Sequence, residues 1–169
     1  MKTRTRLLPR LRRDRGQSLV EFALVLPILF LLILNAVNFG GFFYAWITVA
    51  NAARAGANYA ALGGASVGTP EATASQVTSM ITTEISTLPN NSSRVVDICQ
   101  NNNGTVTALS GTCSSIPGDP EPGNFVLTSV DVIYTYKPYI SGFQFPNLRV
   151  FLTIPPTTIH MRTVMRSIQ

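Results

Sequence analysis

Residues 15–34 read RGQSLVEFALVLPILFLLIL, in which a basic residue and a glycine precede a long apolar run. From Phe22 to Leu34 every residue is apolar, and Pro27 lies inside the run. Glu21 stands at the edge of this run, where its charge is unfavourable, because a charged side chain at the centre of a membrane span costs about 2.5–3.5 kcal/mol. A carboxylate in this position therefore indicates a partner or a specific role.

The apolar run extends to Ala50, and only three polar residues and some glycines interrupt it: Asn35, Asn38 and Thr48. As a helix that rises 1.5 Å per residue, residues 22–50 would be about 43 Å long, more than the roughly 30 Å hydrocarbon core of a bilayer. The sequence therefore predicts a helix that spans a membrane and then protrudes. Aromatic residues gather in its distal part, as expected where amphipathic rings meet headgroups: Phe39, Phe42, Phe43, Tyr44 and Trp46.

The basic charge of the chain is concentrated in a leader. Of the 13 Lys and Arg residues, seven precede Gly16, whereas the rest of the chain has six basic and seven acidic residues. Such a distribution is typical of a targeting segment and gives no support for nucleic-acid binding. By the positive-inside rule, the N-terminus lies in the cytoplasm and the chain beyond about residue 50 is extracytoplasmic. We therefore expect a protein of the bacterial cytoplasmic (inner) membrane.

The remainder of the chain predicts one small α+β domain. Alanines at helical spacing between residues 50 and 60 indicate a helix face that can pack closely against a sheet or another helix. A second, short helix is expected over residues 70–88, with Thr69 as its N-cap. Alternating apolar residues between turn-forming residues then predict an antiparallel sheet. Its expected strands are residues 94–99, 105–109, 125–137, 148–154 and 158–166.

The two cysteines, Cys99 and Cys113, lie on the side of the membrane that is predicted to be oxidising. A disulfide between them would close a loop of about 15 residues and contribute about 3 kcal/mol in the chain-entropy model. Two free thiols are the alternative. A metal site is not expected, because no His or carboxylate lies between the two cysteines.

No residue pattern supports an enzyme. His160 is the only histidine, and in the expected strand it alternates with Arg162 and Arg166, which places it on the solvent face. Neither a Gly-x-Ser-x-Gly elbow nor a Cys-His signature accompanies it. The chain also lacks a glycine-rich phosphate loop after a strand. We therefore expect no catalytic residue, no cofactor and no small-molecule substrate.

The leader that ends at Gly16, followed by residues 17–27 with Glu21 in fifth place, resembles the processing site of type IV pilins and pseudopilins. More narrowly, residues 38–44 and the stretch NAARAGANYA at 51–60 are similar to the TadE-like family. This family comprises minor pseudopilins of tight-adherence (Tad/Flp) pilus systems. The resemblance covers residues 12–61.

The resemblance implies a division of the chain and a mechanism. A prepilin peptidase would cut between Gly16 and Gln17, which removes a leader of residues 1–16 and leaves a helix of residues 17–62 and a domain of residues 63–169. The new α-amino group of Gln17 would lie one turn from Glu21, and the carboxylate would pair with the Gln17 amino group of a neighbouring subunit. Pro27 would kink or relax the helix, because proline has no N–H to donate.

The function implied is that of a minor pilin-like subunit that takes part in assembling or priming an adhesion pilus. Its partners would be the membrane, the peptidase, other pilins and the assembly platform. Two alternatives remain open. The chain could be a binding or structural protein on a permanent, unprocessed single-span anchor, or a secreted protein that is cut after Ala52, where residues 50–52 match the A-x-A pattern.

Overall fold

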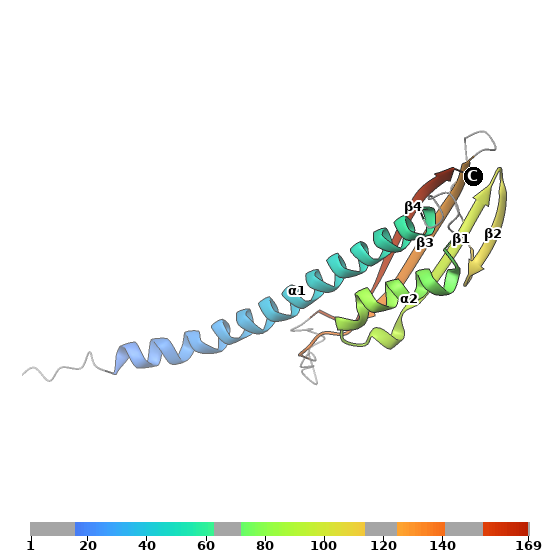
Figure 1. The fold of residues 1–169 in the computed structure, drawn as a ribbon. Coiled ribbons are helices and arrows are strands. Elements are labelled where there is room, and N and C mark those ends of the chain that lie inside the picture. Colours follow the sequence, from blue (N-terminus) through green and yellow to red (C-terminus); the bar gives the residue numbers. More distant parts are fainter. Residues whose placement is uncertain (1–15, 63–71, 114–124, 141–153, 169) are drawn as a thin grey trace, which may run out of the picture.

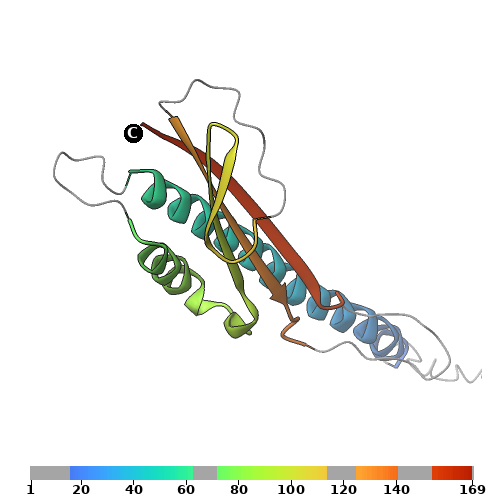
Figure 2. The ribbon, with the colours of Figure 1, turned by 90° about the vertical axis from the view of Figure 1, so that its right-hand side faces the viewer.

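A computed structural model describes residues 16–62, 72–113, 125–140 and 154–168 of the 169-residue chain. One long helix projects from a domain in which two helices cover one face of an antiparallel sheet (Figures 1 and 2). The α+β class, with a long N-terminal helix, a small sheet and one short α-helix, is as the sequence predicts.

The long helix α1 extends from Gln17 to Leu62 without interruption, and Pro27 lies inside it. Its two halves have different environments. Residues up to about 37 are largely exposed, whereas the distal half packs on strands β3 and β4 and on helix α2. Small side chains make this approach possible: a Cβ atom added to Gly56 would lie 2.5 Å from Cδ1 of Ile81 on α2. The predicted packing of a small-residue face is therefore confirmed, and the face contacts both a sheet and a helix.

The short helix α2 begins later than predicted, at Ala74, and ends at Glu84. Its N-cap is Thr73, whose side chain accepts from the backbone N–H of Gln76 while the Gln76 side chain accepts from the backbone of Thr73. Such a capping box satisfies two N–H groups that otherwise have no partner, so it stabilises the helix start at Ala74. The expected N-cap Thr69 lies outside the described residues. After Glu84 the chain tightens into the 3₁₀ turn η2, Ile85–Thr87, instead of continuing as α-helix.

The sheet has four strands in the order β2-β1-β3-β4, and every neighbouring pair is antiparallel. A two-residue turn joins β1 to β2, with positive φ angles at Asn103 and Gly104. Asn-Gly is the preferred sequence for such a turn, because both central residues adopt φ angles that favour it. The strand bounds are β1 Val95–Asn102, β2 Thr105–Ser110, β3 Phe125–Tyr136 and β4 Thr157–Ile168.

Four of the five expected strands are thus present, and their ends differ from the predicted ones by at most three residues. The fifth, residues 148–154, lies almost wholly outside the described residues, and its last residue, Ile154, is not in a strand. A second 3₁₀ turn, η3 (Asn91–Ser93), connects the end of the helical segment to β1.

The hydrophobic core lies between the two helices and the sheet. Helix α1 contributes mainly small residues and the sheet contributes larger ones, including two tyrosines, Tyr134 and Tyr136, whose side chains are fully buried. Small residues on the helix thus face large residues on the sheet, which lets the layers interdigitate. The core residues are Ala45, Val49, Ala52, Ala53, Ala57, Val77, Ile81, Ile85, Leu88, Ile98, Val130, Val132, Tyr134, Tyr136 and Ile159.

Candidate functional site

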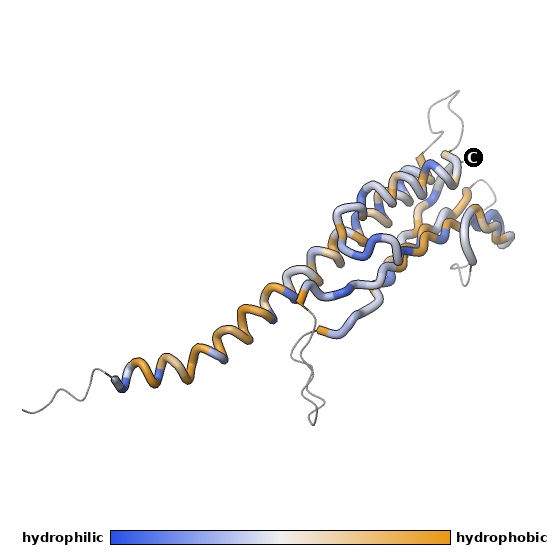
Figure 3. The backbone as a smooth tube through the Cα atoms, turned by 90° about the horizontal axis from the view of Figure 1, so that it is seen from below, coloured by the Kyte–Doolittle hydropathy of each residue, from blue (hydrophilic) through white to orange (hydrophobic). Residues whose placement is uncertain are grey.

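The first half of α1 is an exposed apolar rod that leaves the domain (Figure 3). By its length and composition α1 could cross a membrane, and no other helix in the described part of the chain meets that criterion. Residues 19–37 correspond to about 28 Å of helix, close to the roughly 30 Å hydrocarbon thickness of a bilayer. This segment therefore suggests a membrane anchor.

Two of the three polar side chains within the apolar stretch, those of Asn35 and Thr48, bond to their own helix. Asn35 donates from Nδ2 to the carbonyl of Leu31 at 2.9 Å, and Thr48 donates from Oγ1 to the carbonyl of Tyr44 at 2.8 Å. Both bonds link a residue to the one four positions earlier. Because the hydrogen-bonding capacity of these groups is used locally, they remain compatible with an apolar environment.

Glu21 differs from these residues, because its carboxylate lies on the exposed surface of the rod. In the described chain its one hydrogen bond comes from the neighbouring turn, where Nε2 of Gln17 donates to Oε1 of Glu21 at 3.2 Å. Residues four apart share one face of a helix, so the start of α1 presents Gln17 and Glu21 together. An exposed carboxylate with a single neutral donor can still accept a cationic partner from another chain.

Gly16 lies in a turn directly before α1, and its carbonyl accepts from the backbone N–H of Val20 at 3.3 Å. A Cβ atom at this position would meet nothing within 4 Å, and the φ angle of Gly16 is not positive. Among the described residues, therefore, no contact requires a glycine at residue 16.

The junction where α1 joins the domain contains a fully buried polar residue, Asn38. Its side-chain amide bonds twice to Ile140, donating from Nδ2 to the carbonyl at 3.1 Å and accepting at Oδ1 from the backbone N–H at 3.1 Å. The hydroxyl of Tyr136 donates to the backbone carbonyl of Asn38 at 3.0 Å. These three bonds attach the helix to the chain segment that follows β3. Sequence reasoning treated Asn38 as an interruption of the apolar run and as part of the family resemblance, and it did not predict this buried contact.

Close packing at Gly41 completes the junction. A Cβ atom there would lie 2.5 Å from the ring of Tyr139 and 2.9 Å from the hydroxyl of Tyr136. The ring of Phe42 packs edge-on against the Tyr136 ring, with centroids 5.5 Å apart. The helix is thus fixed rigidly where its exposed half begins. Of the aromatic residues expected at a headgroup layer, Phe39, Phe43, Tyr44 and Trp46 are exposed near this junction.

The predicted disulfide between Cys99 and Cys113 is present, with Cα atoms 5.8 Å apart. The bridge joins Cys113, in the segment after β2, to Cys99 in β1. Beside it, Oδ1 of the buried Asp97 accepts from the backbone N–H of Thr112 at 3.2 Å. Gly111 has a φ of 73°, and a Cβ atom there would overlap the Asp97 carboxylate, so only glycine fits.

His160 lies on the solvent face of β4, as expected, but it has an ionic neighbour that the sequence did not reveal. Its Nε2 lies 3.3 Å from Oδ1 of Asp131 on β3, and Arg162 binds the same carboxylate with Nη2 at 2.6 Å from Oδ2. The hydrogen bond with Asp131 raises the pKa of the Arg162 guanidinium. The register of β3 and β4 places Asp131 opposite Arg162, so the pairing is a cross-strand contact that supports the sheet.

The fold and these contacts define a class of protein: an α+β domain that is carried rigidly on a long apolar helix able to cross a membrane. The family model for TadE-like protein matches residues 16–58, which confirms the resemblance seen in the sequence. The match contains Gly16, Glu21 and Asn38 and ends within the distal part of α1. No curated protein and no solved structure matches the chain.

Proposed function

We propose that this chain is a minor pilin-like subunit that helps to assemble or prime a pilus of the tight-adherence type. The observation that carries the proposal is the division of α1 into an exposed apolar half and a half that is locked into a domain, within the segment that matches the TadE-like family. A helix of this design can lie in a bilayer before assembly and pack among other helices afterwards. Other pilins and the assembly platform are the partners that this role requires.

A prepilin peptidase cuts the chain between Gly16 and Gln17 in this proposal. The support is that no described contact requires a glycine at residue 16, while Gln17 is the first residue of α1. A bulky side chain at this position would obstruct the close approach of a peptidase to the backbone, whereas glycine leaves it open. Removal of the basic leader leaves a positive α-amino group at the helix start, where its ordinary pKa is about 7.7–8.0.

The carboxylate of Glu21 then pairs with the Gln17 amino group of a neighbouring subunit. Pairing neutralises two charges that are both unfavourable in an apolar environment. The exposure of Glu21 supports this role, because the carboxylate is accessible from outside the helix. Residues 63–169 in this proposal are extracytoplasmic and contact other subunits, while the N-terminus lies in the cytoplasm.

The structure weighs against the secreted alternative. Cleavage after Ala52 would remove Ala45, Val49 and Ala52 from the core together with the buried Asn38. The domain would lose much of the helix that covers its sheet. The remaining alternative is a permanent, unprocessed anchor.

The N-terminal residue of the mature protein distinguishes a processed pilin-like subunit from a permanent, unprocessed anchor. The experiment expresses the wild type, Gly16→Ala and Gly16→Arg in cells that contain a prepilin peptidase, and it measures the intact mass and N-terminal sequence of each product. We expect Gln17 as the first residue of the wild type and of the alanine variant, and an uncut leader in the arginine variant. Retention of the leader in all three would establish the anchor, and normal cleavage of Gly16→Arg would show that the assigned bond is wrong.

A further inference from the structure

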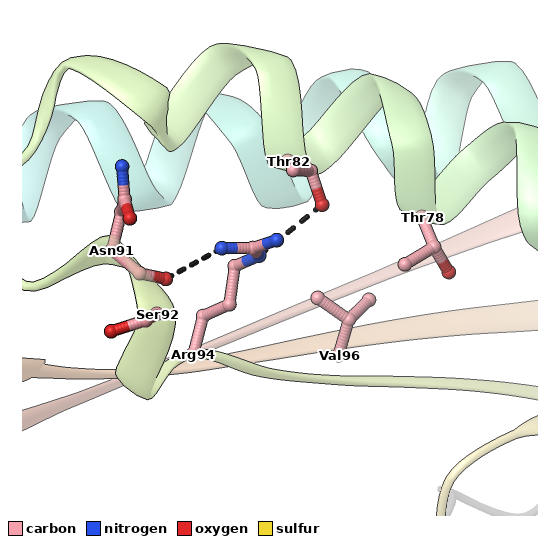
Figure 4. Close-up of a pocket in the computed structure, with 6 residues that line it drawn as sticks. All are labelled: Thr78, Thr82, Asn91, Ser92, Arg94 and Val96. Carbon is pink, nitrogen blue, oxygen red and sulfur yellow. Dashed lines mark hydrogen bonds between the residues drawn. The ribbon is translucent and has the colours of Figure 1, made fainter.

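An open pocket of about 440 Å³ lies on the flank of the domain, between α2, η3 and the start of β1 (Figure 4). It is separate from the apolar rod and from the junction at Asn38. Five of its six lining residues carry hydroxyl, amide or guanidinium groups, and none is acidic. The lining residues are Thr78, Thr82, Asn91, Ser92, Arg94 and Val96.

Arg94 is the one charged group of the pocket, and two hydrogen bonds hold it in place. Its Nε donates to Oγ1 of Thr82 at 3.2 Å, and its Nη1 donates to the carbonyl of Asn91 at 2.7 Å. Arg94 forms no ion pair with another described residue. The guanidinium is therefore half-buried and fixed, but within the described chain it has no counter-charge, and its Nη2 group donates no hydrogen bond.

The hydroxyl of Thr82, beside Arg94, has donor capacity that the described fold does not use. Its Oγ1 accepts from Nε of Arg94, so its own proton is free to be donated to another group. Figure 4 shows the Thr82 oxygen directed at the guanidinium, whereas the oxygens of Thr78 and Ser92 are turned away from it. A negatively charged acceptor would satisfy the Nη2 group of Arg94 and the Thr82 hydroxyl together.

We propose that this pocket binds the carboxylate of an acidic side chain on a partner protein. A guanidinium presents its N–H groups in a planar fork, which matches the geometry of a carboxylate. The pocket supplies one positive charge, which a carboxylate balances, whereas a phosphate of charge near −2 would remain partly uncompensated. The pocket is open, so a side chain projecting from another protein can reach it. The proposal does not depend on leader processing or on the role of Glu21.

The test is an NMR titration of the full, unprocessed chain in detergent micelles with ¹⁵N-labelled arginine. The probes are the blocked peptide Gly-Gly-Glu-Gly-Gly, its Gln analogue, and inorganic phosphate at matched ionic strength. We expect saturable shifts at the Arg94 Nε–H with the Glu peptide and binding about tenfold weaker, or undetectable, with the Gln peptide. Arg94→Gln should abolish the response, whereas Arg54→Gln, which removes an exposed arginine of α1 that does not line the pocket, should leave it unchanged.

Three results would overturn the proposal. The first is equal affinity for the Glu and Gln peptides. The second is an equal loss of affinity for the Glu peptide in the Arg54 and Arg94 variants. The third is an affinity for phosphate about tenfold higher than for the Glu peptide, which would make the pocket a phosphate site. Arg94→Gln could disturb folding, because Arg94 connects α2 to η3. Thr82→Val therefore serves as a second variant, since it removes the hydroxyl beside the guanidinium and keeps the charge of Arg94. Full retention of peptide affinity in this variant would also contradict the proposal.

Discussion

Asn38 of α1 and Ile140 after β3 exchange two hydrogen bonds, both 3.1 Å long, between one side-chain amide and one backbone peptide unit. The pair joins residues 102 positions apart at the point where the apolar rod leaves the domain. Because Asn38 is fully buried, its side-chain amide has these two bonds in place of bonds to water. The orientation of the rod relative to the sheet therefore depends on this amide.

We expect Asn38→Ala to lower the free energy of unfolding of the domain by about 1–3 kcal/mol, because it leaves two backbone groups of Ile140 without partners. Asn35→Ala is the matched control, since Asn35 bonds only to its own helix. Thermal unfolding followed by circular dichroism in micelles measures both. Equal melting temperatures for the two variants would contradict the role given to Asn38.

Two adjacent glycines of α1 provide a sharper comparison. A Cβ atom at Gly41 would overlap the rings of Tyr139 and Tyr136, whereas a Cβ atom at Gly40 would meet nothing within 4 Å. We expect Gly41→Ala to destabilise the domain by about 1–3 kcal/mol through overpacking. Gly40→Ala should be neutral or stabilising by up to about 1 kcal/mol, because alanine is the better helix former. The same thermal unfolding experiment compares the melting temperatures of the two variants. A lower melting temperature for Gly40→Ala than for Gly41→Ala would contradict the close packing at Gly41.

The disulfide predicts a dependence of stability on redox state. Replacing Cys99 and Cys113 together by serine should lower the free energy of unfolding by about 2–5 kcal/mol, because the unfolded chain loses a constraint. Reduction of the wild type should give the same melting temperature as the double variant. If the reduced wild type melts like the oxidised protein, the bridge contributes nothing to stability.

Tyr134 predicts loss of stability at alkaline pH. Burial raises the pKa of its hydroxyl to about 12, assisted by Tyr139 and Tyr136, and the hydroxyl donates to the carbonyl of Pro89. The unfolded chain releases this proton near pH 10 and the folded chain only near 12, so stability is complete below about pH 10 and falls as the pH rises toward 12. Tyr134→Phe should flatten this decline, measured as melting temperature against pH. The exposed control Tyr59→Phe should retain the full slope.

Glu21 distinguishes a pilin-like subunit from a simple anchor. If its carboxylate pairs with the amino group of a neighbour, Glu21→Ala and Glu21→Gln should both leave membrane insertion intact and reduce assembly. Membrane insertion should remain intact, because both substitutions remove a charge from the start of the span. Co-purification of partner pilins, or surface pilus counts at matched expression, measures assembly, with the exposed Glu84→Gln as control. Undiminished assembly with both variants would remove the proposed pairing.

The sequence by itself predicted the long helix, the α+β class, the disulfide and the resemblance to the TadE-like family. Each of these follows from local or pairwise information: an unbroken apolar run, strand and turn residues in alternation, two cysteines, and a short motif around Gly16 and Glu21. Even the Asn103-Gly104 turn can be inferred from residue type, because few residues adopt its backbone angles.

Only the tertiary structure decided how these parts meet. The side chain of Asn38 bonds to Ile140, and Gly41 leaves room for the ring of Tyr139, because the fold brings together residues that are distant in sequence. The hydrogen bond between Arg94 and Thr82 likewise depends on how α2 packs beside the start of β1. The same holds for Asp131, which faces Arg162 through strand register. Periodicity reveals which face of an element is apolar, but not which partner covers it. That choice depends on the packing of side chains from several elements at once, which no local pattern encodes.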